Sequence, residues 1–113
     1  MDEPRVKASV WISAQVRMCG LLALPIVVRR RGDADAGSIL IRLDRMDGYS
    51  VLLSQSRDSY GKPAWLQTSG KAPIPDGDVE NYIERRVKTD PDIWVIEIED
   101  KDGRYEPDAP VIL

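Results

Sequence analysis

The acidic residues between positions 97 and 102 are the first group in the chain with side chains suited to catalysis. Glu97, Glu99, Asp100 and Asp102 offer carboxylate oxygens, which are the ligands that Mg²⁺ and Ca²⁺ prefer. A metal-dependent hydrolase or nuclease that uses the carboxylates near Glu97 and Glu99 is therefore the alternative function. One expected strand carries the whole group and ends there, so we interpret these residues as a solvated strand end before a turn. We predict no metal site and no catalytic residue.

A run of arginines, Arg29 to Arg31, is the second group with recognisable chemistry. Together with the aromatic ring of Trp65, it could contact phosphates and stack on bases, as RNA-binding surfaces do. Neighbouring residues of a strand point to opposite faces, which separates Arg30 from the other two, and the chain carries a net charge of −3. We therefore predict a salt-bridged hairpin end, no nucleic acid partner, and RNA binding only as the third function.

The chain contains no histidine and one cysteine. The missing histidine removes the usual general base, the partner of a serine or cysteine nucleophile, and the commonest zinc ligand. Cys19 has no cationic neighbour on its own helix face, so we interpret it as a small, partly buried hydrophobic residue. The sequence has no glycine-rich phosphate-binding motif. These observations favour a protein that is not an enzyme and binds no cofactor.

The overall composition is that of one globular domain. The chain has 113 residues, of which 42% are hydrophobic and 31% are charged, as in ordinary soluble domains. The longest apolar run, residues 21–28, contains Pro25 and is too short to cross a bilayer. The N-terminal residues are acidic where a signal peptide would be basic. We predict a single α+β domain over residues 1–113, a cytoplasmic location and no membrane partner.

Hydrophobic periodicity predicts two helices. In residues 9–22 and again after residue 78, apolar side chains recur at spacings of three and four residues, as on the buried face of a helix. The second helix must end before the Asp90-Pro91 pair. The first stripe consists of Trp11, Ala14, Met18 and Leu21, and the second of Val79, Tyr82, Ile83 and Val87.

Alternating apolar residues and turn residues predict the strands. The segment 93–98 is apolar at every position except Glu97, so it must be covered on both faces and lie inside a sheet. The expected fold class is α+β, with a mainly antiparallel sheet of about five strands and two covering helices. The pairing direction of the inner strand stays open. Four further strands are expected at residues 26–31, 38–44, 49–56 and 62–68, with a loop at 69–77 and a marginal strand at 111–113.

Three segments carry a resemblance to a known family. They are Ser9–Arg17, Pro25–Gly37 and Asp90–Asp100. With the spacing between them, they make the chain similar to a small bacterial family catalogued as a domain of unknown function. The resemblance implies a compact, cytosolic α+β protein and implies no activity or catalytic residue.

The sheet face that carries Leu40 and Leu52 is the predicted partner surface. Alternation points these two leucines away from the neighbouring apolar residues of their strands, toward a face that also carries serines and charges. Apolar groups rimmed by arginine are typical of protein-binding surfaces. We therefore predict a non-enzymatic protein-interaction module or homo-oligomer. Its partner-binding residues would be Leu40, Leu52, Arg29, Arg31 and Arg42.

Overall fold

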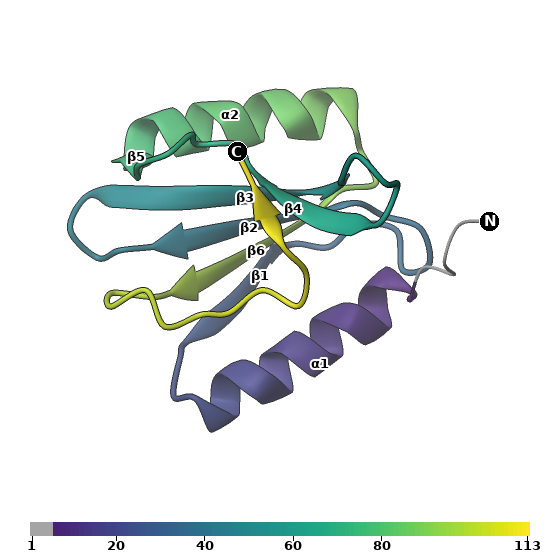
Figure 1. Cartoon of the computed structure of the whole chain (residues 1–113), viewed down its shortest axis with the longest axis horizontal. Coiled ribbons are helices and arrows are strands. Elements are labelled where there is room, and N and C mark those ends of the chain that lie inside the picture. Colours follow the sequence, from purple (N-terminus) through teal and green to yellow (C-terminus); the bar gives the residue numbers. More distant parts are fainter. Residues whose placement is uncertain (1–5) are drawn as a thin grey trace.

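The computed structural model describes residues 6–113 and has two helices and seven strands in that range (Figure 1). The helices are α1 (Ala8–Leu21) and α2 (Asp76–Thr89). The strands are β1 (Ile26–Arg30), β2 (Ile39–Asp44), β3 (Tyr49–Arg57), β4 (Pro63–Gln67), β5 (Ile74–Pro75), β6 (Trp94–Glu99) and β7 (Val111–Ile112). Neither helix in the described range is long and apolar enough to span a membrane.

The strands form one mixed sheet in the order β1-β6-β2-β3-β4-β7, and β5 pairs with β3 beside that path. The pairs β2–β6 and β4–β7 are parallel, and the other pairs are antiparallel. The α+β class with two covering helices is confirmed, but the sheet is mixed and about five strands was an undercount. Strand β7 lies where a marginal strand was predicted at 111–113, whereas β5 lies within residues 69–77, which were wrongly predicted as a loop. Each has two residues, too few to show a periodic pattern.

Strand β6 lies inside the sheet, between β1 and β2, as its composition predicts. The parallel register places Leu40 beside Val95 and Ile41 beside Ile96. Because successive side chains alternate, Leu40 and Val95 point to one face, and Ile41 and Ile96 to the other. Each face has its own hydrophobic cluster, one under α1 and one under α2, and Figure 1 shows the two helices on opposite sides of the sheet.

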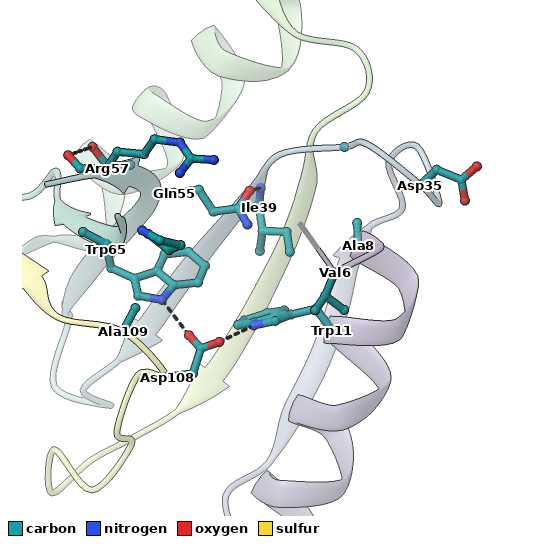
Figure 2. A pocket seen from close by; sticks show the side chains of 14 residues that line it. Val6, Ala8, Trp11, Asp35, Ile39, Gln55, Arg57, Trp65, Asp108 and Ala109 are labelled. Carbon is teal, nitrogen blue, oxygen red and sulfur yellow. Dashed lines mark hydrogen bonds between the residues drawn. The ribbon is translucent and has the colours of Figure 1, made fainter. Parts of the chain in front are cut away.

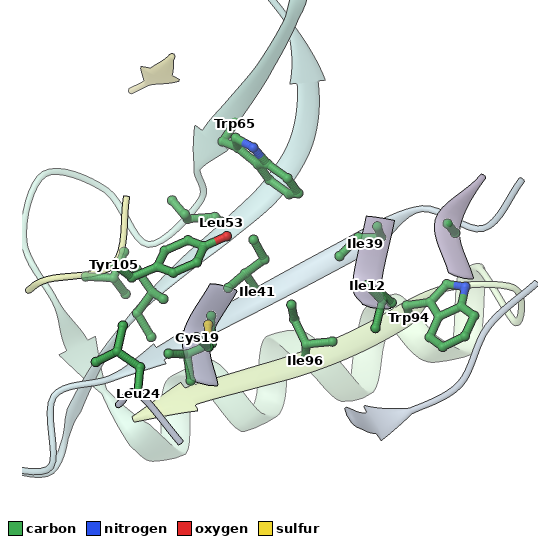
Figure 3. Close-up of a cluster of buried hydrophobic side chains, with 14 residues drawn as sticks. Ile12, Cys19, Leu24, Ile39, Ile41, Leu53, Trp65, Trp94, Ile96 and Tyr105 are labelled. Atoms are coloured by element: carbon green, nitrogen blue, oxygen red, sulfur yellow. The ribbon is translucent and has the colours of Figure 1, made fainter. Parts of the chain in front are cut away.

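The cluster under α1 is seen in Figure 3, where Ile12 and Cys19 lie against Ile41 and Ile96. The buried side chains of α1 are Ala8, Ile12, Gln15 and Cys19. The predicted stripe is therefore wrong: Trp11 and Met18 only flank the buried line, Ala14 is exposed, and Leu21 is 83% exposed. Helix α1 contains one charged residue, Arg17. Because apolar residues occur on nearly all sides of this helix, periodicity could not identify the buried face.

The cluster under α2 contains both leucines of the predicted partner surface. Leu40 is 0% and Leu52 is 1% exposed, and they pack with Val79 and Ile83 of α2. The proposal that this face is open to a partner is wrong, because the two helices dock on opposite faces and α2 covers it. The predicted stripe of α2 is confirmed, with Val79 and Ile83 buried and its other two members, Tyr82 and Val87, packed against the cluster.

Burial of Leu40 predicts a large loss of stability on truncation. We expect Leu40→Ala to lower the free energy of unfolding by about 2–5 kcal/mol, because it leaves a cavity between β2 and α2. The control is Val27→Ala on the edge strand β1, where the side chain is 56% exposed and the loss should be about 0.5 kcal/mol. Urea titration measures both. Equal, small losses would show that α2 does not cover this face in solution.

Candidate functional site

A cavity of about 270 Å³ opens at the end of the sheet where β2 begins and β3 ends, beside the first turn of α1 (Figure 2). We call it the indole pocket, because two tryptophans, Trp11 of α1 and Trp65 of β4, are among its lining residues. The other lining residues are Val6, Ala8, Asp35, Gly37, Ile39, Gln55, Ser56, Arg57, Pro63, Ala64, Asp108 and Ala109. Five separate segments of the chain therefore meet at this one place.

Asp108 holds the two indoles together. Nε1 of Trp11 donates a hydrogen bond of 2.8 Å to Oδ2 of Asp108, and Nε1 of Trp65 donates one of 2.9 Å to Oδ1 (Figure 2). Hydrogen bonds to a charged acceptor are stronger than those between neutral groups. One carboxylate thus fixes the orientation of a ring on the helix and of a ring on the sheet.

The last strand of the sheet brings Asp108 into position. β7 runs parallel to β4, with Trp65 beside Val111, and the amide of Trp65 donates to the carbonyl of Pro110 at 2.8 Å. Asp108 lies only two residues before Pro110, so this pairing places its side chain near the edge of the Trp65 ring. The short strand in the tail therefore has a role in building the site.

The two indoles form a continuous wall. Their ring centroids are 5.4 Å apart and their planes are inclined at 44°, a separation at which tilted aromatic rings are in contact. No ligand group fits between them. A ligand would instead lie against the side of this indole wall that lines the pocket together with Ile39 and Gln55, where Trp11 is half-buried and Trp65 is 3% exposed.

The polar groups at the rim differ in how fully they are paired. Oε1 of Gln55 accepts the amide hydrogen of Ile39 at 2.9 Å. Asp35 forms an exposed ion pair with Lys7 at 3.7 Å. Arg57 donates to the carbonyl of Gly61 at 2.7 Å, and none of the ion pairs within residues 6–113 includes it.

Two glycines bring the connection between β1 and β2 to the rim. A Cβ atom on Gly32 or Gly37 would collide with the carbonyl oxygen of Asp92. The same oxygen accepts the amide hydrogen of Asp33 at 2.9 Å. This close approach keeps Asp35 at the mouth of the pocket, and the need for it explains why only glycine fits.

Burial favours the neutral forms of two side chains, Tyr105 and Cys19. The Tyr105 hydroxyl donates to Oε1 of Gln15 at 2.8 Å, and burial, followed by the charge of Asp108, raises the pKa of the Tyr105 phenol. Burial, followed by the charge of Asp100, raises the pKa of the Cys19 thiol. Cys19 is fully buried rather than partly buried. A raised pKa and burial both work against a thiolate nucleophile.

The predicted partner residues Arg29 and Arg42 belong to a different part of the molecule. Arg42 is buried and contacts Glu80 at 2.6 Å and Glu97 at 2.8 Å, and it also contacts Asp76 at 3.0 Å. Arg29 forms two hydrogen bonds to Glu80, which lower the pKa of that carboxyl group. This cluster joins α2 to the sheet, and its groups are paired with one another rather than presented to a partner.

The other two arginines of the run lie apart from Arg29 and from each other. Strict alternation would place Arg31 on the same side as Arg29, but the register of β1 shifts between Val28 and Arg30 and the alternation is broken there. Arg30 donates to the carbonyl of Ile93 at 2.8 Å, and the guanidinium of Arg31 lies 5.6 Å from the ring centroid of Trp94. The salt-bridged hairpin end is confirmed in part, because Arg29 is ion-paired, but its partners are Glu80 and Glu97. The structure gives no support for RNA binding through Arg29–Arg31.

The carboxylates near the end of β6 do not converge. Glu97 faces Arg42, Glu99 is exposed, and Asp100 is buried, where it accepts hydrogen bonds from Arg45 and from the amide of Tyr105. In the described part of the chain, no group of three or more His, Cys, Asp or Glu side chains could hold a metal ion. The metal-dependent hydrolase or nuclease therefore gains no support.

Sequence reasoning missed the residues that build the indole pocket. Trp11 was assigned to the helix core, Trp65 to base stacking, and Asp108 to no role. The hydrogen bonds of Asp108 span 97 residues to Trp11 and 43 residues to Trp65. No local spacing reports such a contact, and the only signal was the presence of indoles in a chain with few aromatic residues.

The fold and the site together define a small α+β protein, in which a mixed sheet between two helices carries an aromatic-walled pocket at one end. The chain belongs to the DUF1491 family of proteins of unknown function, whose model matches residues 6–106. The resemblance noted in the sequence is thereby confirmed. Family membership supports the fold and assigns no activity.

Solved structures agree with this assignment. The chain is similar to a DUF1491 family protein from Caulobacter crescentus CB15, whose crystal structure matches with 36% identity, a TM-score of 0.84, and coverage of 96% of this chain and 100% of that one. An NMR structure of a DUF1491 family protein from the same organism matches with 35% identity and a TM-score of 0.81. The match covers 98% of this chain and 100% of that one.

A more distant likeness concerns the fold alone. The solution structure of protein Atu0922 from A. tumefaciens matches with 24% identity, a TM-score of 0.73, and coverage of 94% of this chain and 100% of that one. No curated protein matches the chain.

Proposed function

We propose that the chain is a non-enzymatic protein-interaction module, which uses the indole pocket to hold one apolar side chain of a partner polypeptide. The observation that carries the proposal is the indole wall, whose two rings are fixed by Asp108 before any ligand arrives. Preorganised aromatic surfaces bind with little loss of side-chain entropy, and tryptophan is enriched among residues that dominate binding energies.

The chemistry of the pocket supports binding rather than catalysis. Both oxygens of Asp108 accept indole N–H groups, which leaves this carboxylate poorly placed to act as a base. The chain has no histidine. The volume of the indole pocket, about 270 Å³, lies just below the range of drug-sized ligand pockets. The pocket therefore suits a single side chain.

A set of end-blocked amino acids tests the proposal. N-acetyl-leucinamide and N-acetyl-phenylalaninamide should bind, and N-acetyl-serinamide should not, because apolar burial of one side chain contributes about 1.5–3 kcal/mol. Dissociation constants of about 6–80 mM follow from so small a contact. Two-dimensional NMR should show shifts of the Trp11 and Trp65 indole resonances, and the resonance of Trp94, which does not line the pocket, should stay unchanged.

A matched pair of variants locates the binding. Val6 is 58% exposed and lines the pocket, whereas Val10 is 56% exposed and does not. Val6→Trp should therefore obstruct the pocket and abolish binding, and Val10→Trp should leave it intact. Equal binding by both variants, or no preference for the apolar amino acids in the wild type, would refute the proposed site.

Self-association is a second candidate, favoured by the outward face of α1. Val10 and Leu21 are exposed there, and Arg17 is the one charged residue of the helix, although 31% of the whole chain is charged. Exposed apolar helix faces of this kind are typical of interaction surfaces. A second copy of the chain could pack its own α1 against this face.

Sedimentation velocity over a range of concentrations tests this second candidate. The wild type should shift toward a dimer as concentration rises, and Leu21→Glu should remain monomeric because it places charge in the contact. Leu113→Glu, at another position that is 70% exposed, is the control and should behave as the wild type. A wild type that sediments as a monomer at every concentration rules this candidate out.

A further inference from the structure

Two polar donors lie at one end of the indole pocket, near the C-terminal end of β3. Gln55 and Arg57 are two residues apart on a strand, so they share a face, and Gln55 pairs directly with Trp65 across β3 and β4. Both side chains line the pocket. In Figure 2 Gln55 and Arg57 are seen on one side of the Trp65 ring, with Asp108 on the other.

Each of these side chains has donor capacity left over. The oxygen of Gln55 accepts the amide hydrogen of Ile39, which fixes the orientation of the side-chain amide. No hydrogen bond from its NH₂ group is found within residues 6–113, and that nitrogen is not a fully buried, unpartnered atom. A guanidinium offers five N–H donors, and Arg57 uses one of them on Gly61.

The carboxylates around the pocket are already engaged by charged or N–H partners, whereas Arg57 takes part in none of the ion pairs within residues 6–113. Asp35 pairs with Lys7, and Asp108 accepts both indoles at the far end of the wall. Positive charge at one end and negative charge at the other orient a ligand along the wall. An anionic group is favoured at Arg57 and repelled by Asp108.

We infer that the ligand of the indole pocket is the C-terminal residue of a partner polypeptide, with its free carboxylate at Arg57 and Gln55 and its apolar side chain on the indole wall. The inference rests on the proposed function and adds the chemical class of the ligand. An aspartate or glutamate side chain supplies a carboxylate without an apolar group of this size. An apolar C-terminal residue supplies both within one residue, which matches the size of the pocket.

The test compares two peptides that differ only at the C-terminus. N-acetyl-Gly-Gly-Gly-Leu with a free carboxylate should bind about tenfold or more tightly than its C-terminal amide, because a charged hydrogen-bond pair forms only with the acid. Binding is followed by the NMR shifts of the Trp11 and Trp65 indoles. Equal affinities would overturn the inference while the proposed function stands, since apolar binding would then be independent of charge.

Substitutions of Arg57, with one of Arg17 as a control, test whether Arg57 causes the preference for the free carboxylate. Arg57→Gln should bind the acid and the amide alike, and NMR resonances outside the pocket that match those of the wild type show that the variant is folded. Arg57→Lys should recover part of the preference. The control is Arg17→Gln, at an exposed position of α1, which removes the same charge and should keep the full preference. An undiminished preference in Arg57→Gln would overturn the inference.

Two further comparisons complete the test. One distinguishes a peptide C-terminus from a free small acid as the source of the carboxylate, and the other distinguishes failure of this inference from failure of the proposed function. N-acetyl-leucine should bind no more than about tenfold more tightly than the tetrapeptide. A larger advantage would show that the pocket takes free small acids and excludes polypeptides, which overturns the inference. If neither peptide nor the blocked amino acid amides bind, both the inference and the proposed function are wrong.

Discussion

The parallel pairing of β2 with β6 is the constraint on which the rest of the structure depends. Both strands carry apolar side chains on both faces, and these side chains form the centre of two separate clusters. Burial of apolar surface is the main favourable contribution to folding, so each face needs its own cover. The chain supplies α2 on one face and α1 on the other, with β1 and β3 protecting the strand edges.

The indole pocket follows from how that cover is arranged. β3 and β4 extend the sheet beyond β2, and the tail returns along β4 as β7. The first turn of α1 meets this corner from below, where Trp11 contacts Trp65. Because the helix covers only part of the corner, a cavity is left, and the Asp108 carboxylate fixes its walls. The same chain crossings that bury the core therefore place the site.

Prediction from sequence succeeded where one strand or helix determines its own environment. The composition of residues 93–98 placed β6 inside the sheet, and the stripe of α2 was clear because its other faces are charged. It failed for Leu40 and Leu52, since alternation separates two faces of a strand without saying which helix covers each. It failed for the pocket because Asp108 meets its indoles only after the whole sheet has formed.

The indole pocket can bind as proposed only if its indole wall is fixed in the free protein. Hydrogen exchange of the indole N–H groups, followed by NMR, tests it most directly because exchange requires the hydrogen bond to open. We predict that Trp11 and Trp65 both exchange much more slowly than N-acetyl-tryptophanamide, and that Asp108→Ala accelerates both together. If Trp11 in the wild type exchanges at the rate of the free model compound, the wall is not preformed and the account is contradicted.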